Sequence, residues 1–258
     1  MPATEIYLIR HGQTDYNRQF RLQGRSDIPL NRLGLAQARA AHEALRGVHF
    51  DAVYASPLRR AVDTACIVSG WPEEKIELDP RLIEIGFGIW EGSDFRTLGP
   101  AGTAFFETPQ NYTPPQGGES LDSVLRRTGG FLDALQQLPE DRHVLVASHG
   151  AALNALYLQI KGLPLSLFWT HRFGNCSIVR LGLSGGSGSA ERRKALAKAL
   201  DLPEHLSPNA LLDVLNLLTT REELAETLRR LAGERVTETR VLTEGEAPEL
   251  AAYLKDAT

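Results

Sequence analysis

The segment EIYLIRHG, residues 5–12, joins a short apolar run of strand type to an Arg-His-Gly motif. A second segment, HVLVASHG at residues 143–150, has the same arrangement and ends in Ser-His-Gly. In a parallel α/β sheet, ligands bind beyond the carboxyl ends of the strands. The two segments therefore predict that His11 and His149 reach the same edge of one sheet. The glycine after each histidine lets the backbone approach a ligand closely.

Strands and helices are expected to alternate around these two segments. Strands are predicted at 5–10, 51–56, 143–148 and 177–181, and helices at 31–46, from residue 57, at 120–138 and from residue 151. Asn31 is a suitable N-cap for the first helix, whereas the Gly-rich segment 82–92 is predicted to be a loop. This alternation indicates an α/β fold with a mostly parallel sheet.

A third strand end carries the segment SPLRR, residues 56–60. Its serine is expected to act as N-cap and its proline to occupy the first helical position, which places Arg59 in the first turn. A helix N-terminus favours anions, and guanidinium groups from Arg10 and Arg59 are planar, multi-donor partners for phosphate. Together with the two histidines, they predict a site for a dianionic phosphate ester.

Composition excludes several other classes of protein. The 258 residues carry a net charge of −4, which gives no general attraction to nucleic acid or to an anionic membrane. Cys66 and Cys176 are far apart and fit no zinc or disulfide framework, so a reducing, cytoplasmic location is expected. No signal peptide or membrane-spanning apolar stretch is recognised.

Taken in order, the motifs resemble the histidine phosphatase superfamily in its phosphoglycerate mutase-like branch. The matching segments are LIRHGQTDYN (8–17), LQGRSDIPLNRLGLAQA (22–38), YASPLRRAVDTA (54–65), LIEIGFGIWEG (82–92), PQGGES (115–120), VASHGAALNAL (146–156) and NCSIVRL (175–181). The resemblance implies a three-layer α/β/α sandwich with a mostly parallel sheet over residues 1–183.

The resemblance also implies a chemistry. His11 would be the nucleophile that takes the phosphoryl group in a covalent intermediate. Arg10, Arg59 and His149 would hold the phosphate oxygens and neutralise charge in the transition state. Glu84 would be the general acid that protonates the departing alcohol and then the general base that activates water.

Further contacts to the phosphate are implied at three positions. Asn17 matches the family asparagine that donates to phosphate, Gln23 stands where a polar contact is frequent, and Gly150 allows close backbone approach. No cofactor is expected, and no metal site, because the sequence has neither an HExxH motif nor a phosphate-binding loop with lysine.

Three functions are compatible with these residues. The first is hydrolysis of a small phosphomonoester, as in α-ribazole phosphatases and broad-specificity phosphatases. The second is phosphoglycerate mutase activity, although GFGIWEGSDFRTLGP (86–100) resembles the shorter, phosphatase-like form of that region. The third is a partner-binding protein without catalysis. A lid at 97–116, rich in aromatic residues and proline, is expected to set the choice of substrate.

The remainder of the chain has a different composition. Residues 184–189 are a Gly/Ser linker, natural or engineered, and residues 190–258 are expected to form a small, mainly helical module of unknown function. This module is a candidate for binding a partner, and the protein is a possible homodimer.

Overall fold

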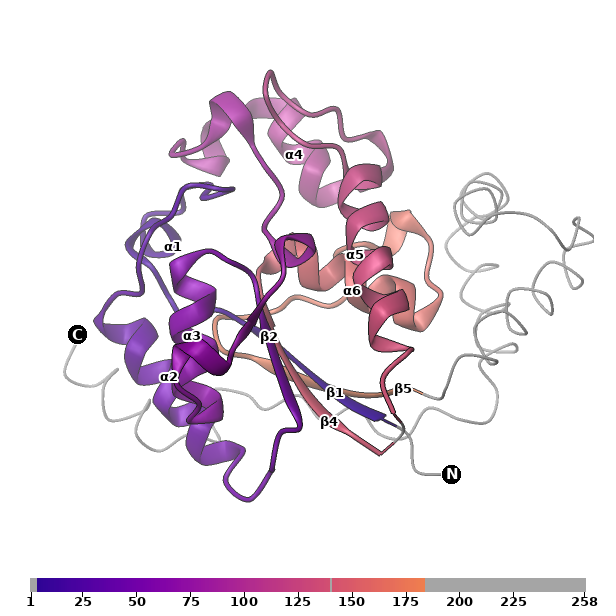
Figure 1. Ribbon diagram of the computed structural model, residues 1–258. Helices are drawn as coiled ribbons and strands as arrows, with labels where there is room; N and C mark the ends of the chain where they lie inside the picture. The colour runs from indigo at the N-terminus through magenta and orange to yellow at the C-terminus, as the bar shows by residue number, and fades with distance from the viewer. Residues whose placement is uncertain (1–3, 140, 184–258) are drawn as a thin grey trace, which may run out of the picture.

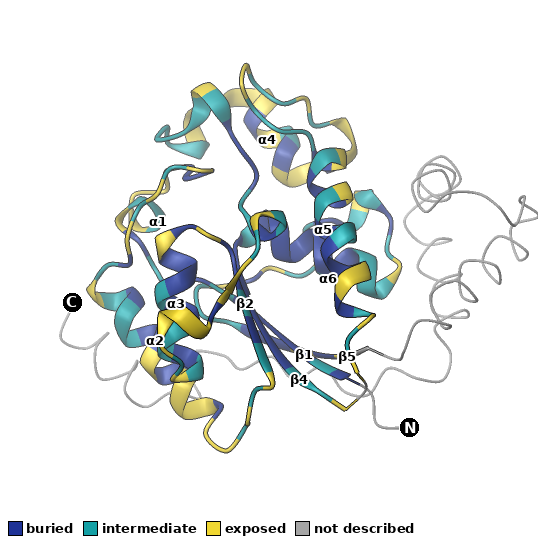
Figure 2. Ribbon diagram, viewed as in Figure 1, coloured by how far each residue is buried: buried dark blue, intermediate teal, exposed yellow. Residues whose placement is uncertain are grey.

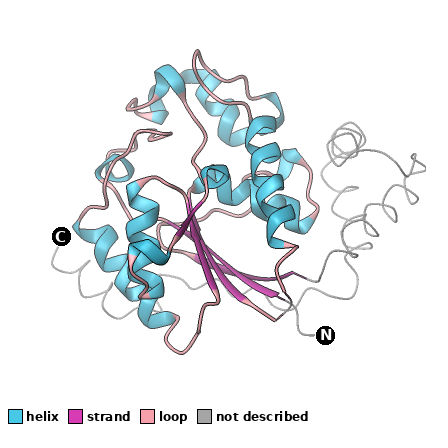
Figure 3. Ribbon diagram, viewed as in Figure 1, coloured by secondary structure: helices cyan, strands magenta, loops and turns pink. Residues whose placement is uncertain are grey.

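Five strands form one sheet in the computed structural model, which describes residues 4–139 and 141–183 (Figure 3). The strands are β1 (Thr4–Arg10), β2 (Ala52–Ala55), β3 (Glu77–Leu78), β4 (His143–Ser148) and β5 (Ile178–Leu183). Their order in the sheet is β3-β2-β4-β1-β5, with β5 antiparallel to β1 and the other pairs parallel. The prediction of a mostly parallel sheet is confirmed.

Helices cover both faces of this sheet, giving the expected three layers (Figure 1). The longer helices are α2 (Arg32–Ala44), α3 (Arg59–Ser69), α5 (Leu121–Leu135) and α6 (Gly150–Lys161). Side chains of β1 alternate between the faces. Ile6 and Leu8 pack in one core with α5 and α6, whereas Tyr7 and Ile9 pack in a second core with α2 and α3. Figure 2 shows the strands buried between the layers.

The predicted start of one helix is found, and the predicted start of the next is wrong. Asn31 caps α2, because its Oδ1 accepts from the backbone N–H of Gly34 at 2.9 Å. The helix that was expected to begin at residue 57 begins at Arg59 instead, with Leu58 at the N-cap position and no side-chain cap. Ser56 lies two residues before that position, and its buried hydroxyl accepts from the backbone N–H of Leu58 at 3.4 Å and bonds to the ring of His149 at 2.7 Å.

The sequence analysis missed three short elements. These are α1 (Asp15–Arg18), strand β3 and helix α4 (Gly99–Glu107), the last of which lies inside the predicted lid. Helix α4 packs through Phe105 on a third core that joins it to α5 and α6. The predicted linker and helical module at 184–258 lie outside the described residues. Among those described, no helix is both long and apolar enough to cross a membrane.

Candidate active site

The carboxyl ends of β1 and β4 meet at one edge of the sheet. The backbone N–H of His11 donates to the carbonyl of Ser148 at 2.9 Å, which continues the parallel pairing one residue past the strands. The rings of His11 and His149 lie 5.1 Å apart between centroids, and both side chains are buried. The two histidines therefore meet as the sequence predicts, beside a cavity of about 600 Å³ that His11 lines.

The hydrogen bonds of His11 define its tautomer. Its Nδ1 is 2.7 Å from the carbonyl oxygen of Gly12, which can only accept, so Nδ1 carries the proton. Nε2 is then the nitrogen with the free lone pair. Burial, together with the positive charges of Arg60 and Arg10, lowers the pKa of His11 well below its ordinary value. The ring is therefore neutral, and thus nucleophilic, at neutral pH.

His149 is held by two partners in the opposite tautomer. Arg60 Nε donates to its Nδ1 at 3.2 Å, so Nε2 carries the proton and donates to Ser56 Oγ at 2.7 Å. Burial, with the nearby charge of Arg60, lowers the pKa of His149 well below its ordinary value. This ring lies next to His11 but does not line the cavity.

The arginine at the start of α3 that faces the site is Arg60, which corrects the prediction of Arg59. The guanidinium of Arg59 is half-exposed and pairs with Asp63 at 2.6 Å and Glu73 at 2.7 Å on the outer surface. Arg60 is fully buried and lines the cavity. Burial lowers the pKa of Arg60 to about 10, so it remains a cation at neutral pH.

The periodicity of α3 contains a signal that distinguishes the two arginines. Arg60, Thr64 and Val68 are buried at intervals of four residues, which is one face of a helix. Arg59 and Asp63 form an ion pair on an adjacent, more exposed side of the helix. The same inner face supports the loop that follows β1, because Thr64 Oγ1 accepts from the backbone N–H of Gly12 at 3.1 Å.

Arg60 is positioned by the loop at residues 24–26. Its Nη1 donates to the carbonyl of Ser26 at 2.7 Å and its Nη2 to the carbonyl of Gly24 at 2.8 Å. The carboxylate of Glu91 holds this loop from the other side, since it accepts from the backbone N–H groups of Arg25 and Ser26, each at 3.0 Å. Glu91 therefore fixes the loop whose carbonyls orient Arg60.

Arg10 offers the cavity a donor that nothing else uses. Its Nη1 donates to the carbonyl of Phe173 at 2.8 Å, whereas its Nε is buried without a hydrogen-bond partner among the described residues. Burial lowers the pKa of Arg10, and the charge of Glu84 opposes that shift. A buried guanidinium nitrogen with no partner suits an anionic oxygen. We call Arg10, His11 and Arg60, which line the cavity, and His149, which lies behind them against His11 and Arg60, the floor.

Amide side chains border the floor. The Oδ1 of Asn17 accepts from the backbone N–H of Thr14 at 3.1 Å and from Asn175 Nδ2 at 3.3 Å, which leaves its own Nδ2 for a ligand. The Oε1 of Gln23 accepts from the hydroxyl of Thr14 at 2.9 Å, which leaves Nε2 in the same way. Asn17, Gln23 and Asn175 all line the cavity, and Asn175 is a member that sequence reasoning missed.

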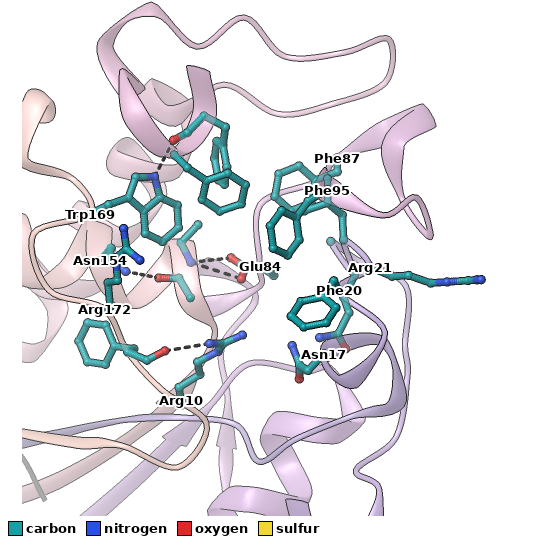
Figure 4. Close-up of a pocket in the computed structure, with 18 of the residues that line it drawn as sticks. Arg10, Asn17, Phe20, Arg21, Glu84, Phe87, Phe95, Asn154, Trp169 and Arg172 are labelled. Atoms are coloured by element: carbon teal, nitrogen blue, oxygen red, sulfur yellow. Dashed lines mark hydrogen bonds between the residues drawn. The ribbon is translucent and has the colours of Figure 1, made fainter. Parts of the chain in front are cut away.

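Glu84 lies against the N-terminus of α6 (Figure 4). Its carboxylate accepts from the backbone N–H groups of Ile85 at 2.9 Å, Ala151 at 3.2 Å and Ala152 at 3.3 Å. A Cβ at Gly150 would stand 3.7 Å from the carboxylate of Glu84 and 4.0 Å from Arg10 Nε, so glycine keeps the space between these charges open. The residues predicted from the two strand ends and the loop thus converge, with Arg60 in place of Arg59.

Aromatic rings form the rest of the cavity, which we call the wall: Phe20, Phe87, Phe95, Phe105, Phe106 and Trp169. The rings contact one another in series, with centroids 4.9 Å apart for Phe105 and Phe106 and 5.6 Å apart for Phe106 and Trp169. Trp169 Nε1 donates to the carbonyl of Phe105 at 2.6 Å. Within residues 4–139 and 141–183, no group of three or more acidic, histidine or cysteine side chains is arranged to hold a metal ion.

Comparisons with known proteins agree with this geometry. The profile of the histidine phosphatase superfamily (branch 1) matches residues 6–195. The probable phosphoglycerate mutase GpmB of Proteus mirabilis is 34% identical over 181 residues, which cover 69% of this chain and 84% of that protein. Phosphoserine phosphatase 1 of Hydrogenobacter thermophilus is 31% identical over 213 residues, covering 78% and 94%. The structure of Bacillus stearothermophilus YhfR superposes with a TM-score of 0.65 at 34% identity, covering 71% and 93%.

Proposed function

The chain belongs to the histidine phosphatase superfamily, and from that premise we propose that it hydrolyses a phosphomonoester through a phosphohistidine on His11, without a metal ion. Membership in this family supports phosphatase or mutase activity in general. The more specific proposal concerns the acceptor, which is water, and the roles of individual residues. Relatives named phosphoserine phosphatase and glucosyl-3-phosphoglycerate phosphatase support hydrolysis.

The first step transfers the phosphoryl group to the protein. The lone pair of His11 Nε2 attacks phosphorus while the bond to the ester oxygen breaks, and the carboxyl proton of Glu84 passes to that oxygen as the alcohol leaves. In the second step Glu84 takes a proton from water, whose oxygen attacks phosphorus and displaces Nε2. Inorganic phosphate leaves, His11 is restored, and Glu84 is again protonated.

The floor supplies the positive charge for both steps. The unused Nε of Arg10 and the guanidinium of Arg60 stabilise negative charge on the phosphoryl oxygens, and the free amide nitrogen of Asn17 is a further donor. Because backbone carbonyls hold the two guanidinium groups in place, little reorganisation is needed during the reaction. His149 supports Arg60 through their hydrogen bond and keeps a second neutral ring beside His11.

The single observation that carries the proposal is the state of His11. Its Nδ1 proton is fixed on the carbonyl of Gly12, and burial beside two arginines lowers its pKa. These two facts leave a neutral ring with an available Nε2 next to an anion-binding floor. A histidine that served only as a hydrogen-bond donor to phosphate would need neither the low pKa nor this tautomer.

A phosphomonoester panel assayed with and without a chelator tests the proposal. Wild type should release phosphate equally in both conditions, and phosphate from a labelled ester should be found on the protein after a rapid quench. His11→Ala should lose about 10³-fold or more in kcat/KM and should carry no label. Undiminished turnover by His11→Ala, or loss of wild-type activity in the chelator, would contradict the proposal.

Mutase activity is the second candidate, because the Proteus mirabilis relative is named a probable phosphoglycerate mutase. A mutase returns the phosphoryl group from histidine to a hydroxyl of the substrate. Incubation with 3-phosphoglycerate distinguishes the two activities. A hydrolase releases inorganic phosphate, whereas a mutase forms 2-phosphoglycerate with little phosphate. The short segment 86–100 that follows Glu84 favours the hydrolase.

A further inference from the structure

Asn154 on α6 carries a buried polar atom that the proposed chemistry does not use. Its side chain is 1% exposed and lines the cavity. The amide Nδ2 donates to the carbonyl of Gly150 at 2.8 Å, whereas Oδ1 has no hydrogen-bond partner among the described residues. The opposite amide orientation would place two oxygens against each other, so the unpaired atom is the acceptor. Buried acceptors in folded proteins are rarely left unpaired.

The position of Asn154 relates it to the alcohol portion of a substrate. It lies one helical turn after Gly150, a rise of about 6 Å along α6. The carboxylate of Glu84 stands over the turn between them, bonded to the backbone of Ala151. In the proposed mechanism the alcohol departs toward Glu84, so Asn154 flanks the alcohol and the phosphate stays on the floor. Figure 4 shows Asn154 and Trp169 on the same side of Glu84.

The surroundings of Asn154 in this part of the cavity are aromatic rings and one cation. Trp169 and Phe105 both line the cavity, with ring centroids 5.1 Å apart. Aromatic rings supply a large apolar contact area. Arg172 also lines the cavity and lies beside Asn154 in Figure 4. An alcohol bound here would therefore meet apolar surface, the guanidinium of Arg172 and an amide acceptor that lacks a donor.

We propose that Asn154 is a specificity-determining residue: its Oδ1 accepts a hydrogen bond from a hydroxyl or ammonium group on the alcohol portion of the substrate, whose remaining surface is apolar and packs on the wall. This assignment rests on the proposed function in one respect, the departure of the alcohol toward Glu84. A site with a buried acceptor discriminates against an analogue that lacks the donor, because the acceptor then remains desolvated and unpaired.

Binding to the full chain carrying His11→Ala tests the assignment, since this variant does not consume the ligand. The ligands are ethylphenyl phosphate, (hydroxymethyl)phenyl phosphate and (aminomethyl)phenyl phosphate, each with the substituent at the ortho, meta and para positions. The three substituents have nearly the same size and differ in the terminal methyl, hydroxyl or ammonium group. At one ring position, a donor-bearing ester should bind about tenfold more tightly than its ethyl counterpart. The ester that binds more tightly than its ethyl counterpart identifies the donor as hydroxyl or ammonium.

A second substitution separates recognition from structural support. Asn154→Leu, added to His11→Ala, should abolish the preference for the donor and leave binding of the ethyl ester within about twofold. Gln159→Leu is the matched control. Gln159 lies on the same helix and donates to the carbonyl four residues before it, Ala155, at 3.0 Å, but it does not line the cavity. This control should keep the full preference.

The outcomes distinguish this assignment from the proposed function. Equal affinity for donor-bearing and ethyl esters at every ring position would overturn it, even if the wild type hydrolyses all of them. Equal weakening of all esters by Asn154→Leu would also overturn it, by showing a purely structural role. If wild type hydrolyses none of the esters but the preference depends on Asn154, the proposed hydrolysis of such esters fails, whereas the hydrogen bond from the ligand to Asn154 is supported as a binding contact.

Discussion

The floor and the wall of the cavity are held in place in different ways. Each floor side chain is fixed by directional hydrogen bonds to backbone or to another floor residue, as for Arg60 with its carbonyl partners and His149. The wall is held mainly by ring contacts, and two of its members are considerably exposed, Phe20 at 47% and Phe106 at 36%. The floor therefore keeps its geometry, whereas the wall can be altered without disturbing the floor.

The difference follows from the elements that carry the two regions. Floor residues follow the ends of β1 and β4 or lie in the first turn of α3, so the sheet sets their directions. Wall residues come from α4 and from loops, and four of them, Phe87, Phe95, Phe105 and Trp169, belong to the third core beside the sheet. We expect reaction chemistry to depend on the floor and substrate choice to depend on the wall. The predictions below test this division.

The largest expected contrast is between two adjacent arginines. Arg60→Ala should lower kcat/KM for a phosphomonoester by about 10²–10³-fold, because a buried cation aimed at the phosphate is lost. Arg59→Ala should change kcat/KM by less than about twofold, since its surface ion pairs contribute little to stability and face away from the site. Steady-state kinetics on both variants, with thermal melts to confirm folding, provide the measurement. A similar loss of kcat/KM in both variants would contradict the placement of Arg60 in the site and of Arg59 on the outer surface.

The two arginines also show how much of the site could be predicted from the sequence. Two apolar strands ending in histidine were sufficient to bring His11 and His149 together, because parallel strands end at one edge of a sheet. A helix was correctly predicted in this segment, but its start was predicted two residues too early. Arg59 was predicted to face the site, whereas Arg60 does. In the folded protein Ser56 bonds to His149 on the neighbouring strand's end, a contact that no local pattern contains.

Other members of the site were not predictable for a related reason. Glu91 acts through a loop 65 residues before it in the chain, by accepting from the backbone N–H of Ser26. Asn154 has one paired and one unpaired amide atom, a distinction that only the folded geometry makes visible. Strand ends are encoded locally, whereas contacts between loops distant in sequence are not.

Glu84→Gln tests whether the residue at the border of floor and wall moves a proton. The amide oxygen can still accept from the backbone at the start of α6, so the fold should be retained. Turnover of an alkyl phosphate should fall about 10²-fold, because its alkoxide must be protonated as it leaves. Turnover of p-nitrophenyl phosphate, whose leaving group needs no proton, should fall far less in its first step. Burst kinetics on the two esters would reveal the difference, and equal losses would argue against an acid role.

Buried neutral histidines should make the floor sensitive to acid. The pKa values of His11 and His149 lie below their ordinary value of 6.5 in the folded protein. Below pH 6.5 the unfolded chain therefore binds more protons than the folded chain, and the free energy of unfolding falls as pH falls. Between pH 6 and 5 each histidine should contribute a slope approaching about 1.4 kcal/mol per pH unit. Urea unfolding of His11→Gln should show a smaller slope, whereas the exposed control His49→Gln should not.

The smallest expected effect is at the wall, in Phe106→Ala. The ring of Phe106 is 36% exposed and contacts Phe95, Phe105 and Trp169, so its removal enlarges the cavity without opening the core. We expect KM for a phosphate ester of an aromatic alcohol to rise about threefold to tenfold, from lost apolar contact, with kcat nearly unchanged. Inorganic phosphate, which occupies only the floor, should inhibit the variant and the wild type equally. If kcat falls while KM stays constant, the wall contributes to the chemical step, and the division between floor and wall is wrong.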